Sequence, residues 1–76
     1  MSFLERKIKE FHTHEQTTAS AEWTIQHDLN RLPVVNVYSI VNGNEIVVNP
    51  LDVEVVDMNT CKLKFVNPIS GIAEVF

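Results

Sequence analysis

The chain has 76 residues, a mass of 8.7 kDa and a formal net charge of −4. A length below the roughly 100–200 residues of a typical domain leaves room for one small domain only. Hydrophobic residues make up 45% and charged residues 21%, which is a globular composition and excludes general disorder. A core of this size is marginally stable alone, so we expect copies or a partner to cover part of the surface.

The charge and hydropathy of the chain exclude two classes of partner. Six basic residues against ten acidic ones are too few to neutralise phosphates, so we expect no nucleic-acid partner. No run of about 18 apolar residues and no signal peptide is present, so we expect no membrane span and synthesis in the cytoplasm.

The first 21 residues differ in pattern from the rest. Leu4, Ile8 and Phe11 recur at helical spacing, which predicts a short amphipathic helix that needs a surface to lie on. Its apolar stripe either packs on its own domain or docks on a partner. Residues 12–21 are polar and rich in Thr and Ser, which favours a linker. We therefore expect an N-terminal helix and linker arm over residues 1–21, followed by an antiparallel β-domain over residues 22–76.

From residue 22 onwards the period becomes two, which is typical of half-buried strands. Two turn signals are clear: Asn42-Gly43-Asn44 predicts a tight hairpin, and residues 57–60 predict a second turn. A third turn is expected at residues 67–71, before a last strand. The predicted strands lie at residues 22–29, 34–41, 45–48, 52–56, 61–66 and 72–76. The fold class expected is all-β, a small antiparallel β-sandwich or barrel of about six strands with a short N-terminal helix or arm.

The alternation also predicts the core. Trp23 is the largest anchor available to so small a domain. The side chains expected inside are Trp23, Ile25, His27, Leu29, Val35, Val37, Leu63 and Phe65.

A longer set of residues carries a resemblance to a known family over roughly residues 11–76. The matching positions are His12-x-His14-x-Gln16, Ala19-Ser20-x-x-Trp23-x-Ile25-x-His27-x-Leu29-x-Arg31-x-Pro33-Val34-Val35-x-Val37-Tyr38, Asp57-x-Asn59-Thr60 and Ser70-Gly71-x-Ala73. In this order the chain resembles the small β-module of tailed-bacteriophage virion proteins, which recurs in tail-fibre, baseplate and head-associated proteins.

The resemblance implies a non-enzymatic structural protein of a tailed-phage virion: capsid decoration, connector, or tail or baseplate accessory. Its partners would then be other virion proteins and copies of itself, and its location the virion. We expect assembly through the N-terminal arm and through sheet edges, whose unpaired N–H and C=O groups accept another strand. The interface residues expected are Phe3, Leu4, Ile8, Phe11, Ile72 and Phe76.

Few residues suggest chemistry. His12 and His14 would project to one face of an extended segment and are the only pair with metal-ligand spacing, but hydrogen-bonded surface histidines are the expected interpretation. His27 and Asp28 are adjacent on a strand and point to opposite faces, so they do not form a triad with Ser20. Cys61 is expected to be a buried, inert thiol. We therefore expect no catalytic residues, no cofactor and no enzymatic activity.

Two other functions remain open at the level of sequence. A host-surface glycan-binding module would need exposed aromatic rings, for which Tyr38 and Trp23 are the only candidates, although both are better placed for the core. A regulatory phage protein acting inside the host would be absent from purified particles.

Overall fold

The computed structural model describes residues 10–76, and this part of the chain is all-β, with 73% of it in strands and no helix. The strands are β1 (His12–Gln26), β2 (Val35–Val41), β3 (Asn44–Val48), β4 (Asp52–Asp57) and β5 (Thr60–Val75). The expected all-β, antiparallel class is confirmed. The predicted N-terminal helix lies, apart from its last two residues, outside the described residues.

Strand β5 is the central strand of the sheet and pairs with β1, β2 and β4. Strand β1 pairs with β5 along most of its length on one side, from His12 opposite Val75 to Gln26 opposite Thr60. On the other side, β4 pairs with the first half of β5 and β2 pairs with the second half, with β3 beyond β2. The described strands form one open sheet, and a sandwich or a closed barrel is not confirmed.

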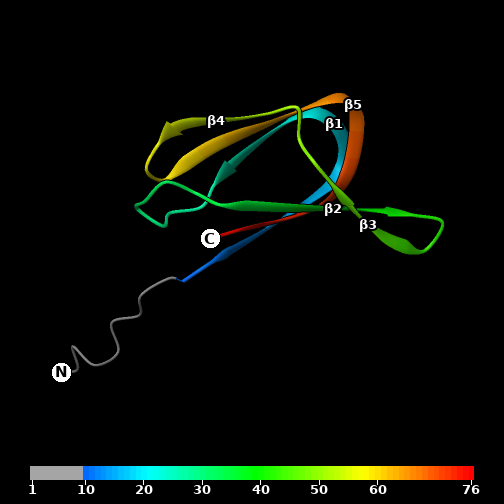
Figure 1. Ribbon diagram of the computed structural model, residues 1–76, viewed down its shortest axis with the longest axis horizontal. Helices are drawn as coiled ribbons and strands as arrows, with labels where there is room; N and C mark the ends of the chain where they lie inside the picture. Colours follow the sequence, from blue (N-terminus) through cyan, green and yellow to red (C-terminus); the bar gives the residue numbers. More distant parts are fainter. Residues whose placement is uncertain (1–9) are drawn as a thin grey trace.

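Both long strands bend sharply together, so that the two halves of the sheet lie one over the other (Figure 1). The register between them shifts on either side of Ser20, which pairs with Ile69. Between their flanking pairs, residues 17–19 of β1 and residues 65–68 of β5 have no ladder partner in the other strand. Such irregularities increase bending and twist, which is how a five-stranded sheet encloses its own core.

The predicted linker over residues 12–21 was wrong, because β1 begins at His12. The β-domain therefore starts ten residues earlier than residue 22. Exposed and half-buried side chains alternate from Phe11 to Gln16, so this polar segment has the period of a strand. Its main chain is held by antiparallel pairing with the end of β5, in which the paired residues are 55 to 63 positions apart in the chain. No local pattern reveals such a partner.

The predicted turn at residues 67–71 was also wrong, because β5 continues through it as a bent strand. Five strands replace the expected six among residues 10–76. Pro68 lies where β5 lacks ladder partners, so its missing N–H costs no strand pairing. Gly71 makes no turn either; a Cβ there would collide with the main-chain oxygen of Tyr38, so glycine allows β2 to approach β5.

The two predicted hairpins are confirmed. Asn42 and Gly43 have φ of 52° and 79° and connect β2 to β3, the pair of positive angles that a type I′ turn requires. Met58 and Asn59 connect β4 to β5. Pro50 follows the end of β3, as expected from its missing N–H.

The core lies between the two halves of the sheet, and Trp23 is its largest fully buried side chain. Its ring centroid lies 4.9 Å from that of Phe65 and 5.8 Å from that of His14. Its indole nitrogen Nε1 donates to the main-chain oxygens of Ser20 at 3.0 Å and Ile69 at 3.2 Å. The buried donor is therefore satisfied at the bend. The buried residues are Trp23, Ile25, His27, Leu29, Val37, Cys61, Leu63, Phe65, Ala73 and Val75, with Val35 packed partly buried against them.

His27 and Leu29 are buried although β1 ends at Gln26. The chain turns there, with positive φ at Asp28 and Asn30. This corner rests on the β4–β5 turn: the main-chain oxygen of Asn59 accepts the N–H of His27 at 2.8 Å, and its side-chain oxygen accepts that of Asn30 at 2.7 Å. The strand expected over residues 22–29 therefore ends three residues earlier in the structure, at Gln26, because pairing with β5 stops at Thr60.

Asn59→Ala is expected to lower the free energy of unfolding by about 1 kcal/mol, because it removes the side-chain acceptor of the Asn30 N–H. Urea denaturation followed by circular dichroism measures the change. Asn67→Ala is the matched control, since Asn67 is exposed at the bend of β5. Equal effects of the two substitutions would contradict the role given to Asn59.

Candidate interaction surface

The open edges of the sheet are the first candidate surface. Within residues 10–76, β1, β3 and β4 each pair with a single neighbouring strand. Every residue of β4 is exposed, and β3 extends together with β2 beyond the rest of the sheet (Figure 1). Such edges carry main-chain groups that another strand can pair with.

The outer face of the β1–β5–β2–β3 half is the second candidate. Val37 and Ala73 point into the core, so their neighbours along each strand point outward. The register then places Glu15, Ile72, Tyr38 and Val47 in one row across the four strands. Apolar and aromatic side chains thus occupy the middle of a solvent-facing surface, and Val47 is 69% exposed.

Two adjoining hollows of about 280 Å³ each lie on this outer face. Both are lined by Ile40 and Ile72. One also has Glu15 in its wall, and the other has Tyr38, Glu45 and Glu74. We call the surface formed by Glu15, Tyr38, Ile40, Glu45, Val47, Ile72 and Glu74 the outer acidic face.

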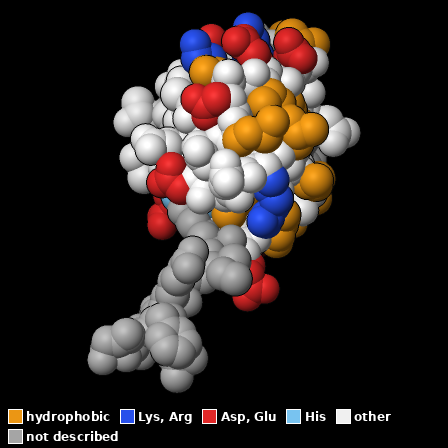
Figure 2. Space-filling view, turned by 90° about the vertical axis from the view of Figure 1, so that its left-hand side faces the viewer, with side chains coloured by type: hydrophobic (Ala, Val, Ile, Leu, Met, Phe, Trp, Pro, Cys, Tyr) orange, Lys and Arg blue, Asp and Glu red, His pale blue; other side chains and the backbone are white. Residues whose placement is uncertain are grey.

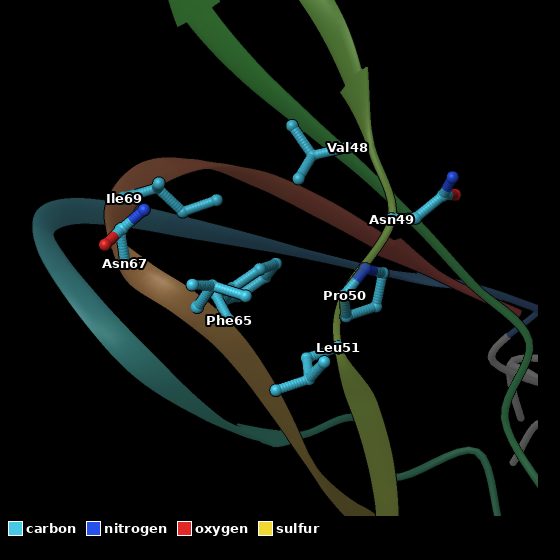
Figure 3. Close-up of a pocket in the computed structure, with 8 residues that line it drawn as sticks. Val48, Asn49, Pro50, Leu51, Phe65, Asn67 and Ile69 are labelled. Atoms are coloured by element: carbon cyan, nitrogen blue, oxygen red, sulfur yellow. The ribbon is translucent and has the colours of Figure 1, made fainter.

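A larger groove of about 450 Å³ lies at the bend of β5 (Figure 3). Phe65 and Ile69 of β5 lie across it from Val48 and Pro50 at the end of β3 (Figure 3). Leu51, at its rim, is 71% exposed. The groove has no charged side chain in its wall, so it suits an apolar group.

A further apolar area lies at the end of the molecule where the corner meets the β4–β5 turn (Figure 2). Leu32 and Met58 are 63% and 47% exposed there. Beside the corner, the rings of Phe11 and Phe76 pack with centroids 6.1 Å apart, and Val34 and Phe76 exchange two main-chain hydrogen bonds.

The predicted interface residues are only partly brought together. Phe11 and Phe76 contact each other and stay half exposed, whereas Ile72 lies in the outer acidic face. Phe3, Leu4 and Ile8 lie outside the described residues.

The other half of the sheet carries a cross-strand ion pair between β4 and β5. Lys64 Nζ lies 3.1 Å from Glu54 Oε1, with both side chains well exposed. The hydrogen bond and the charge of Glu54 raise the pKa of Lys64, with smaller contributions from Glu22 and Asp52. An exposed pair of this kind adds little stability because water and salt screen it.

The histidine pair is placed by β1. His14 Nε2 lies 2.7 Å from the side-chain oxygen of Gln16, and its ring packs on Trp23. Among residues 10–76, no group of three or more His, Cys, Asp or Glu side chains is arranged to hold a metal ion.

Ser20, His27 and Asp28 are not brought into a triad. The Ser20 hydroxyl donates to the main-chain oxygen of Glu22 at 2.8 Å. His27 lies beyond the end of β1 and is buried, with Nδ1 accepting the Leu29 N–H at 3.1 Å. Asp28 Oδ1 accepts from the amide of Gln26.

Cys61 lies buried in the core, and this burial raises the pKa of its thiol above the usual 9.0. Its thiol is thus stabilised in the neutral form, and we expect stability to fall as pH rises above about 9, because the unfolded chain then loses the proton first. Thermal melts at pH 7 to 10.5 test this. Cys61→Ala should remove this part of the pH dependence; an unchanged profile would contradict the assignment.

The sequence did not predict the outer acidic face as a surface; of its residues, only Ile72, as an interface residue, and Tyr38, as a candidate for glycan binding, were singled out. Its residues come from four strands that pair only in the tertiary structure. The one local signal is the alternation along β2. Tyr38 and Ile40 are two residues apart, so their side chains share the face of the strand opposite the buried Val37.

The fold and its surfaces define a class: a small, open, bent antiparallel sheet with exposed edges and an acidic, partly apolar outer face. No known family model, curated protein or solved structure matches the chain. Among the described residues, no helix is long and apolar enough to span a membrane.

Proposed function

We propose that this chain is a non-enzymatic structural protein of a tailed-phage virion, serving as capsid decoration, connector, or tail or baseplate accessory. It assembles with other virion proteins and with its own copies through its N-terminal arm and its open strand edges. The observation that carries the proposal is the set of three edges, β1, β3 and β4, each with one partner strand in the described part of the chain.

The phage assignment itself rests on the sequence resemblance over residues 11–76. Three of the residues that carry this resemblance determine the course of the backbone. Trp23 fills the bend, Asn59 holds the corner, and Gly71 lets β2 approach β5. A shared module is expected to retain such positions because they specify the backbone.

Binding in this role comes from main-chain pairing and buried apolar surface, with no chemical step. The β4 edge carries Val53 and Val55, which are 38% and 42% exposed on the core side of the sheet. A symmetric particle presents many copies of a site, so weak contacts multiply through effective concentration.

Quantitative mass spectrometry of purified particles tests the proposal. We expect the chain to be present, either on the order of hundreds of copies as a capsid decoration or at about three, six or twelve copies as a connector, tail or baseplate component. Its absence from particles would contradict the structural role and favour a regulatory protein acting inside the host cell.

One observation keeps a glycan-binding module as the second candidate. Tyr38 lines a hollow of the outer acidic face, and a sugar bound there would stack on its ring. Trp23 has no exposed surface and does not contribute. Binding on a glycan array that is lost in Tyr38→Ala would favour this function over assembly.

A further inference from the structure

The outer acidic face has an unusual combination of side chains. Its apolar middle is formed by Ile40, Ile72 and Val47 with Tyr38. Around it stand three carboxylates, those of Glu15, Glu45 and Glu74, and no Lys or Arg lines either of its hollows. A ligand that fits this surface must bring both apolar side chains and positive charge.

The basic side chains of residues 10–76 lie outside the outer acidic face. Arg31 is in the corner, and Lys62 and Lys64 lie in the first half of β5, opposite β4. Residues 10–76 hold three basic and nine acidic residues, a net charge of −6. Two bodies of this charge repel each other, so a positively charged contact element would favour self-assembly.

Residues 1–9 have the complementary composition. They contain Arg6, Lys7 and Lys9 against a single acid, Glu5, which gives a net charge of +2. They also contain Phe3, Leu4 and Ile8. Half of the basic residues of the protein are therefore in this nine-residue segment, next to apolar side chains, which is the pattern that the outer acidic face requires.

The geometry at the start of β1 indicates which copy provides the segment. The guanidinium of Arg31 donates to the main-chain oxygen of Glu10 at 2.6 Å, and Phe11 packs on Phe76. Both contacts hold the chain at the end of the sheet, beyond Val75. From this end β1 runs towards the bend, so the outer acidic face of the same copy lies on the C-terminal side of Glu10, away from the point at which residues 1–9 join.

We propose that the outer acidic face binds residues 1–9 of a second copy of this chain. A segment of nine residues spans roughly 30 Å when extended and about 14 Å as a helix. The four strands lie about 4.8 Å apart, so the segment reaches across them in either form. The inference deepens the proposed function in that it rests on assembly through the N-terminal arm, and it names the surface that receives the arm.

The test uses two full-length variants and a control. The face variant is Glu15→Lys with Glu74→Lys, and the arm variant is Lys7→Glu with Lys9→Glu. The control is Glu22→Lys with Asp52→Lys, which makes the same charge change as the face variant on the other half of the sheet, where both residues pair with Lys64.

Sedimentation velocity at low and high salt gives the readout. We expect the wild type to be an oligomer at low salt that dissociates near 1 M salt, where charges are screened beyond about 3 Å. Each of the two variants should associate about tenfold or more weakly, and the control should behave as the wild type. A mixture of the face and arm variants should form a heterodimer, because it contains one intact arm and one intact face.

Three outcomes would overturn the proposal. They are a monomeric wild type, a face variant that associates as strongly as the control, or a mixture that remains monomeric. If the wild type is a monomer and the face and arm variants both melt at a lower temperature than it does, the arm binds the outer acidic face of its own chain. None of these results changes the particle measurement, so failure of this inference and failure of the virion role are distinguishable.

Discussion

Trp23→Ala is expected to leave the protein largely unfolded at physiological temperature. Truncation of a buried aromatic residue costs about 3–5 kcal/mol. A chain of 76 residues has a total stability of roughly 4–11 kcal/mol. The loss is large here because Trp23 is fully buried, contacts Phe65 and His14, and joins the two bent strands through its indole N–H.

Thermal melting followed by circular dichroism measures this effect. We expect the midpoint to fall by roughly 15–30 °C, or the transition to disappear. Trp23→Phe keeps an aromatic ring in the core but removes the donor to the oxygens of Ser20 and Ile69, so it should cost less. Leu51→Ala is the control at a 71% exposed site. A cooperative, unshifted melt of Trp23→Ala would contradict the assignment of Trp23 to the core.

Gly71→Ala has the second largest expected effect, about 3 kcal/mol of stability. The added Cβ would collide with the main-chain oxygen of Tyr38 and lie 3.1 Å from the Cα of Ser39. Both are backbone atoms and have no rotamer through which to move away. Strand β2 must therefore shift from β5, which weakens the pairing of Tyr38 with Ile72.

Gly43→Ala is a matched control for this substitution. Gly43 has φ of 79°, but an added Cβ there meets no atom within 4 Å, so only the backbone strain of about 1 kcal/mol applies. Chemical denaturation ranks the two variants, and amide hydrogen exchange at Tyr38 reports the state of the β2–β5 pairing. If both substitutions cost the same, close packing at Gly71 is not what requires glycine there.

Local patterns were sufficient where the chain interacts with its near neighbours. The Asn42-Gly43 turn, the turn at Met58 and Asn59, and the end of β3 before Pro50 were all predicted correctly. In each case the decisive interaction lies within a few residues, through positive φ or a missing N–H. The side chains of β5 from Cys61 to Phe65 alternate between core and solvent, because successive residues of a strand point to opposite faces.

Long-range pairing explains the errors. Residues 12–21 are polar and rich in Thr and Ser, yet they form a strand because the end of β5 pairs with them. Residues 67–71 have the composition of a turn, yet β5 continues through them, since β1 pairs with Ile69 and Gly71. Composition alone does not distinguish a bend within a paired strand from a turn between two strands.

The sequence by itself determined the all-β class, the two tight hairpins and the alternating side chains around Trp23, because these depend on local backbone preferences and on period-two burial. The tertiary structure alone decided the bend of β1 and β5, the corner held by Asn59 and the outer acidic face. These features bring together residues far apart in the chain, and their positions depend on strand register and on the direction in which the sheet folds over its core.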